Sequence, residues 1–169
     1  EKYGKIRMDK RLKNERKKVI SFLKKNKLPV LDTITSDLMN LLNPNSYQKG
    51  AWFLHMLRDK VGDSSFFKGV RTYYQTYKWK NAKTNDFKLI MENECGCSLD
   101  AFFNQWLKQS SLPVIKVYYE IDKHLYLTIK QHQKEDYSFP LTVRVYYKNG
   151  KYNDHDVFVD SKTKEYVIQ

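Results

Sequence analysis

The sequence predicts an α+β protein in which a helical segment is followed by antiparallel strands, and two observations carry this prediction. Up to about residue 110, apolar residues recur every three to four positions, as in amphipathic helices. After Leu112 and Pro113 the apolar period becomes two, and short strands follow at regular spacing, which favours an antiparallel β-sandwich. The expected domains are therefore a helical domain, 1–110, and a β-sandwich domain, 112–169.

In the helical part, every expected helix after the first has a Ser, Thr or Asp that can cap its first turn. The apolar spacing predicts helices at 9–26, 31–42 (capped by Thr35 or Ser36) and 47–61 (capped by Ser46), then three more capped by Asp63 or Ser64, by Thr84 and by Ser98. Gly62 and Gly96 stand where helix ends are expected. The helix 47–61 is apolar almost all round, so we expect it to be buried.

In the β part, strands are expected near 114–121, 125–129, 141–147, 157–159 and 166–168, with a turn at Asn149-Gly150. A complete sandwich usually has about seven strands, so this one is predicted to be truncated and to leave exposed edges. Tyrosines are frequent here and could form a sugar- or strand-binding face, but we expect most to be half-buried sheet residues: Tyr118, Tyr119, Tyr126, Tyr137, Tyr146 and Tyr147.

The formal net charge of +12 suggests a polyanion binder, yet the charge is local. Residues 1–28 hold 12 Lys and Arg against three Asp and Glu, a net +9, whereas the other 141 residues hold 19 against 16, a net +3. A solvated surface helix explains this pattern better than a nucleic-acid site, and no nucleic-acid partner is expected. No apolar run approaches the ~20 residues that span a bilayer.

Cysteine and histidine spacing excludes a self-contained metal site. Cys95 and Cys97 are separated by one residue, so we expect two ordinary thiols and no disulfide. No histidine has a second histidine four residues away, which excludes the zinc motif H-E-x-x-H. His55 is expected to be a structural core residue.

Tyr47 is the candidate catalytic residue. It stands at the first turn of the expected helix 47–61, where backbone N–H groups are unpaired and the helix dipole favours negative charge. A phenol in this position can donate a hydrogen bond to a developing oxyanion. A tyrosine that merely packs at a helix start is the alternative interpretation of the same residue.

The segment from Tyr47 to Arg58 resembles the part of the aminopeptidase N family of zinc metallopeptidases in which Tyr-x-Lys-Gly-Ala opens a buried helix. Further residues follow in the family's order and spacing up to Pro113. After the proline at that position the family enters a β-sandwich. The resemblance covers about residues 46–169 and rests on Gly62-Asp63, Phe66 or Phe67, Gly69, Tyr73-Tyr74, Asn81-Ala82, Thr84, Asp86-Phe87, Gly96, Leu99, Phe102-Phe103, Gln105-Trp106-Leu107 and Pro113.

The resemblance implies that Tyr47 matches the family tyrosine that stabilises the tetrahedral oxyanion beside zinc. The family's zinc ligands, glutamate base and exopeptidase loop lie upstream of that tyrosine, and this sequence contains none of them. Met91-Glu92-Asn93 looks like that loop but lies inside an amphipathic helix, which indicates coincidence. We expect a C-terminal piece of a longer bacterial aminopeptidase with a thermolysin-like catalytic domain, and we expect this piece to be inactive alone. Zinc and the peptide substrate would bind the parent protein, in which the missing upstream part is the partner of this piece.

The full-length bacterial parent protein is expected to be periplasmic or secreted, although the sequence itself specifies no compartment. The alternative hypothesis is a non-catalytic binding module that uses the basic helix 5–27 on polyanions. A scaffold that lost its metal site in evolution is a third interpretation.

Overall fold

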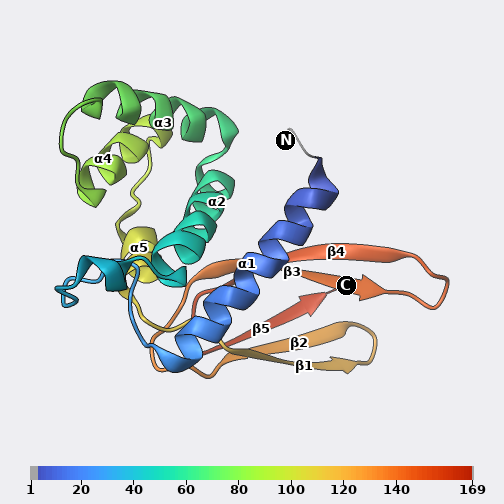
Figure 1. Cartoon of the computed structure of the whole chain (residues 1–169). Helices are drawn as coiled ribbons and strands as arrows, with labels where there is room; N and C mark the ends of the chain where they lie inside the picture. The colour runs from blue at the N-terminus through green and yellow to red at the C-terminus, as the bar shows by residue number, and fades with distance from the viewer. Residues whose placement is uncertain (1–3, 169) are drawn as a thin grey trace. The chain divides into compact units, whose positions relative to one another are not determined.

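The computed structural model describes residues 4–168, without the side chains of residues 5, 6 and 38. The chain divides into two compact units, one up to residue 110 and one from residue 111. Helices make up the first unit and antiparallel strands the second (Figure 1), so the predicted α+β class is confirmed. No helix in the described part is long and apolar enough to cross a membrane.

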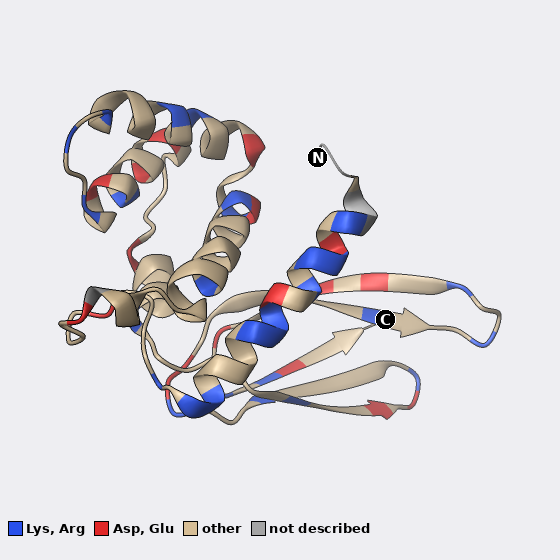
Figure 2. Cartoon of the chain, in the orientation of Figure 1, with Lys and Arg blue, Asp and Glu red and all other residues tan. Residues whose placement is uncertain are grey.

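Helix α1 (Lys5–Lys25) opens the helical unit and starts four residues before its predicted beginning. Val19 is its most buried side chain, at 4% exposure, and lies on an apolar stripe with Leu12 and Leu23. Its remaining surface is dominated by Lys and Arg (Figure 2). The helix packs against the short helical segment η2 (Asn45–Lys49).

The helix predicted at 31–42 is wrong except for the short 3₁₀ turn η1 (Leu38–Leu41). Asp32 Oδ1 accepts hydrogen bonds from the backbone N–H groups of Ile34 and Thr35, at 2.9 and 3.1 Å. Asp37, rather than Thr35 or Ser36, caps η1 by accepting from Met39 N. Aspartate side chains that bind nearby N–H groups offer the backbone an alternative to a helix, and they hold most of this segment in turns.

The remaining helices of the unit are η2, a π-helix that continues into α2 (Gly50–Val61), then α3 (Asp63–Tyr77), α4 (Thr84–Cys95), α5 (Asp100–Phe103) and the π-helical η3 (Asn104–Lys108). Gly62 and Gly96 follow α2 and α4 with φ of 80° and 62°, so both predicted helix ends are confirmed. The cap of α4 lies one residue before the predicted Thr84, because the Asp86 carboxylate accepts from Lys83 N at 2.7 Å.

The core of the helical unit is built mainly from aromatic and large aliphatic side chains. Phe53 of α2 packs edge-on against Phe103 of α5, with ring centroids 4.9 Å apart. Helices α3 and α4 approach closely, since a Cβ at Gly69 would lie 2.6 Å from Met91 Sδ. Helix α2 is only partly buried, contrary to expectation, because Leu54 is 41% exposed. Fully or nearly buried members of this core are Phe53, Leu57, Phe66, Met91, Leu99, Phe103, Trp106 and Leu107.

Cys95 and Cys97 form a disulfide, so the expectation of two free thiols is wrong. The backbone at Gly96 is left-handed, which bends the chain and brings the two Cα atoms to 5.3 Å, within the normal range for a disulfide. The bridge closes the corner between α4 and α5. The same corner is held by Glu92 Oε1, which accepts from Leu99 N at 2.7 Å.

The β unit contains two antiparallel sheets (Figure 1). One has the order β1 (Ile115–Ile121), β2 (Leu125–Gln131), β5 (Thr163–Ile168), and the other pairs β3 (Phe139–Tyr146) with β4 (Tyr152–Val159). All five strands overlap the predicted positions. The β3–β4 hairpin turns at Asn149-Gly150, with a φ of 78° at the glycine, as predicted.

The core of the β unit is small and partly polar. Its buried apolar residues are Leu127, Ile129, Tyr137 and Val159. Gln131 lies among them, and its side-chain amide donates to the carbonyls of Tyr137 and Ser161 at 2.8 and 2.9 Å. The side chain of one glutamine thus joins β2 to the loops before β3 and β5.

Most tyrosines of the β unit are exposed, which corrects the half-buried expectation. Tyr119 is 70% exposed and Tyr146 is 71% exposed, whereas Tyr137 is fully buried. Tyr119 pairs with Leu127 and therefore shares a sheet face with the buried core, yet Ile121 on the same face is also 72% exposed. The sheet face at β1 is consequently uncovered.

Candidate functional site

Tyr47 is the third residue of η2, in the first turn of the continuous helical segment that becomes α2. The turn is capped by Asn43, whose Oδ1 accepts from the backbone N–H groups of Asn45 and Ser46 at 2.8 and 3.2 Å. Ser46 therefore lies inside the helix, and the prediction that it is the N-cap is wrong. The asparagine already satisfies the N–H groups that a serine cap would bind.

Two buried polar side chains flank Tyr47, two residues away on either side. Asn45 is 1% exposed and donates through Nδ2 to Leu28 O at 2.6 Å. Lys49 is 4% exposed and donates through Nζ to Gln109 O at 3.0 Å. Tyr47 itself is 59% exposed. The turn thus buries Asn45 and Lys49 on one side and presents the Tyr47 side chain to solvent.

Lys49 is an unusual buried cation. Burial lowers the pKa of its ammonium group from 10.5 to about 8, because the charged form loses hydration. In the described part of the chain, no carboxylate lies within ion-pair distance of its Nζ atom, and its partner is the uncharged Gln109 carbonyl.

The other candidates singled out in the sequence have structural partners. The His55 side chain is 31% exposed, with Nε2 3.8 Å from an Asp59 carboxylate oxygen and its ring against Trp52. Met91-Glu92-Asn93 lies inside α4, where Met91 is fully buried and Glu92 binds the backbone of Leu99. Neither group is brought near Tyr47 by any contact recorded among the described residues.

The side chains present do not fit a metal ion. Among residues 4–168 no group of three or more His, Cys, Asp or Glu residues is arranged to hold one. Both cysteine sulfurs are already bonded to each other. The part of the chain that the structure describes therefore offers a phenol for chemistry, but no set of three metal-binding side chains.

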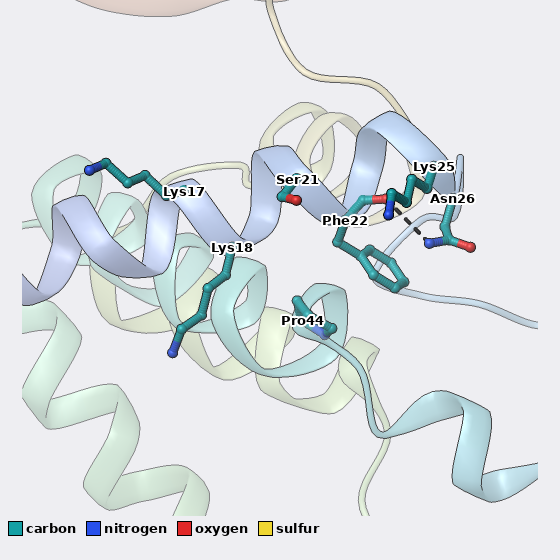
Figure 3. Close-up of a pocket in the computed structure, with 7 residues that line it drawn as sticks. All are labelled: Lys17, Lys18, Ser21, Phe22, Lys25, Asn26 and Pro44. Carbon is teal, nitrogen blue, oxygen red and sulfur yellow. Dashed lines mark hydrogen bonds between the residues drawn. The ribbon is translucent and has the colours of Figure 1, made fainter.

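A second feature is a groove at the C-terminal end of α1, shown in Figure 3. Lys17, Lys18 and Lys25 border it, and Phe22 and Pro44 give it an apolar floor. Asn26 closes one end and donates to Phe22 O at 3.3 Å. The groove combines positive charge with an apolar surface, but every lining residue except Pro44 comes from α1 or its C-cap.

Comparison with known proteins first shows which solved structures share this fold. The structure of Legionella pneumophila aminopeptidase A in complex with aspartic acid is similar, with a TM-score of 0.69 and 21% identity, over 80% of this chain and 16% of that one. The model of the peptidase family M1 domain matches residues 4–106. The chain belongs to peptidase family M1.

Relatives of known name agree with this assignment. Human glutamyl aminopeptidase is 32% identical over 91 residues, which are 53% of this chain and 10% of the relative. Tricorn protease-interacting factor F2 of Thermoplasma volcanium is 27% identical over 135 residues, which are 76% of this chain and 17% of the relative. The chain thus spans between a tenth and a sixth of the length of these relatives.

The sequence indicates Tyr47 as a candidate but does not indicate the residues that hold its turn. Neither Asn43 nor Asn45 is among the candidate residues that the sequence indicates. Asparagine is among the best N-caps, and Asn43 stands three residues before Ser46, which was a usable signal. No local signal could have paired Lys49 with Gln109, because sixty residues separate them.

Proposed function

We propose that this chain is a segment of a zinc aminopeptidase and that Tyr47 is its oxyanion-stabilising residue. The observation that supports this most is the exposed phenol on a turn whose two neighbouring polar residues are buried and hydrogen-bonded. Family membership supplies the reaction class, the hydrolysis of an N-terminal peptide bond. The zinc ligands would belong to other parts of the parent protein.

The chemical role follows from the properties of a phenol. Attack of water on a peptide carbonyl turns the carbonyl oxygen into an oxyanion, and a fixed O–H donor stabilises that charge more than it stabilises the ground state. Tyr47 is 59% exposed, which supports a role in contact with a bound peptide. Removing one such donor in other enzymes slows turnover about 10²–10³-fold, or roughly 3–4 kcal/mol.

The same proposal assigns the two units. Residues 1–110 would be the helical end of the catalytic domain, and residues 112–169 a β-sandwich domain that follows it. The isolated 169-residue chain should bind no stoichiometric zinc and cleave no aminoacyl substrate. Zinc retained after dialysis, measured by metal analysis, or measurable peptidase activity of this chain would contradict that assignment.

The decisive experiment replaces Tyr47 by Phe in the intact peptidase that carries this segment. We expect kcat for an aminoacyl anilide to fall about 10²–10³-fold, with zinc content and thermal unfolding unchanged. Tyr74→Phe is the matched control, because Tyr74 is 64% exposed on α3 and outside the η2 turn. Equal turnover of the two variants would refute the role of Tyr47.

Polyanion binding is the second candidate, supported by the three lysines that border the groove of α1 (Figure 3). Under this hypothesis, binding of random-sequence DNA would weaken steeply with salt. Replacing Lys17 and Lys25 by Glu would abolish it, whereas Lys116→Glu and Lys151→Glu together would leave it unchanged. No binding by the unaltered chain at low salt would eliminate this candidate.

A further inference from the structure

The turn that carries Tyr47 is tied to the rest of the helical unit by two side-chain hydrogen bonds to distant backbone. Asn45 reaches Leu28 O, seventeen residues away, and Lys49 reaches Gln109 O, sixty residues away. Both acceptors are carbonyls outside η2 and α2. The two bonds therefore fix the turn against the chain before it and the chain after it.

The lysine is a costly choice for simple packing. A buried ammonium without a carboxylate loses hydration that one hydrogen bond only partly replaces. Methionine would fill a similar volume without that loss. Burying Asn45 is costly as well, because its Oδ1 atom is buried and has no hydrogen-bond partner among the described residues. Such residues are better explained by the geometry they impose than by the stability they contribute.

We propose that Lys49 and Asn45 are positioning residues, which hold the η2 turn so that the Tyr47 hydroxyl meets the oxyanion of the peptide substrate. The proposal rests on the function proposed above for Tyr47. Neither residue touches substrate. Because a displacement of about 1 Å at a reacting group can slow an enzyme about 10²-fold, the turn needs anchors on both sides of the tyrosine.

The test uses the intact peptidase and the variant Lys49→Met, which keeps the apolar stem and removes the donor. We expect kcat to fall about 10- to 100-fold while KM stays within about twofold. Lys80→Met, at an exposed lysine in the loop after α3, is the control for the substitution itself and should leave kcat unchanged. Asn45→Leu provides a second variant should Lys49→Met fail to fold, with the same expected direction.

The double variants Tyr47→Phe/Lys49→Met and Tyr47→Phe/Asn45→Leu separate positioning from general destabilisation. Once the tyrosine hydroxyl is gone, losing either anchor should slow turnover less than about threefold further, since the anchors act through that hydroxyl. Effects that multiply fully in the double variants would overturn the proposal, as would unchanged kcat in Lys49→Met and Asn45→Leu. If Tyr47→Phe alone changes nothing, the proposed function fails instead, and the two failures are thereby distinguished.

Discussion

The two units of this chain enclose their cores in different ways. The helical unit buries a continuous group of aromatic and aliphatic side chains, with Leu57, Met91 and Leu99 completely out of contact with water. The β unit buries few apolar residues and surrounds them with polar links such as those of Gln131. Its strand β1 leaves Ile121 exposed on the face that elsewhere carries the core.

The two units also differ in how they match the model of the family domain. The match to the M1 domain runs from residue 4 to residue 106 and so covers the helical unit but not the strands. A densely packed interior restricts which residues fit, because each side chain contacts many others. A thin sheet with an open face restricts sequence much less. Four measurements test this difference between the two units.

Truncation in the helical core should have the largest effect. Leu57→Ala should lower the free energy of unfolding of the chain by about 2–5 kcal/mol, since it opens a cavity at a fully buried site. Leu54→Ala, three residues earlier on α2 and 41% exposed, should cost much less. Denaturant unfolding followed by circular dichroism measures both. Equal losses would mean that the helical core does not exclude water from Leu57.

The buried Lys49 should make stability depend on pH. Its pKa is about 8 in the folded chain and near 10.5 when unfolded, so the unfolded state binds more protons between these values. The cost of burying the charge, up to about 3 kcal/mol, is present in full below about pH 8 and fades as pH rises toward about 10.5. The free energy of unfolding, measured by denaturant from about pH 7.5 to about pH 9.5, should rise with pH. The Lys49→Met variant should lack this rise. Parallel profiles would contradict the assigned burial.

In the β unit, the hydroxyl of Tyr137 should matter more than its position in a thin core suggests. It donates to Ser111 O at 2.7 Å, and Tyr137→Phe leaves that carbonyl without this donor. The expected loss is about 1–3 kcal/mol of unfolding free energy. Tyr119→Phe, at a 70% exposed ring on β1, should change stability by less than about 0.5 kcal/mol. A loss of the same size in both variants would argue against a specific role of the buried hydroxyl.

The smallest effect tests the open sheet face directly. Ile129→Val removes one methyl group at a fully buried position and should cost about 0.5–1.5 kcal/mol. Ile121→Val makes the same change on the same face, but at a 72% exposed position, and should be close to neutral. Thermal unfolding of the two variants decides between an open and a covered face. A similar loss at both sites would indicate that β1 is covered in solution.

Much of the architecture could be predicted because strong local signals agreed. Apolar periodicity located the longer helices and the strands, and Gly62 and Gly96 ended helices where expected. The 31–42 segment failed because side chains such as Asp32 compete with helical hydrogen bonding. Helix caps shifted for the same reason, since a neighbouring Asn or Asp can satisfy the first N–H groups from outside the expected position.

The candidate site was only half visible in the sequence. Tyr47 could be selected from its place at a helix start and from the family resemblance, and the family itself is confirmed. Its role stays a prediction. The sequence assigns no partner to Lys49, yet this residue is buried against Gln109 O, a contact that depends on tertiary folding. The prediction of two free thiols is wrong because the spacing of Cys95 and Cys97 does not reveal the left-handed backbone at Gly96.

The bridge between Cys95 and Cys97 has one more consequence. Disulfides persist in oxidising compartments and are opened by the thiol buffers of the cytosol. The bridged chain is lighter by two hydrogens than the reduced one, so its mass shows whether the bridge is closed. The bridge closes a very short loop, so its opening releases little chain entropy. Mass spectrometry would thus distinguish the chain in an oxidising compartment from the chain in a reducing one. We expect the helices on either side of the bridge to keep their fold in both forms.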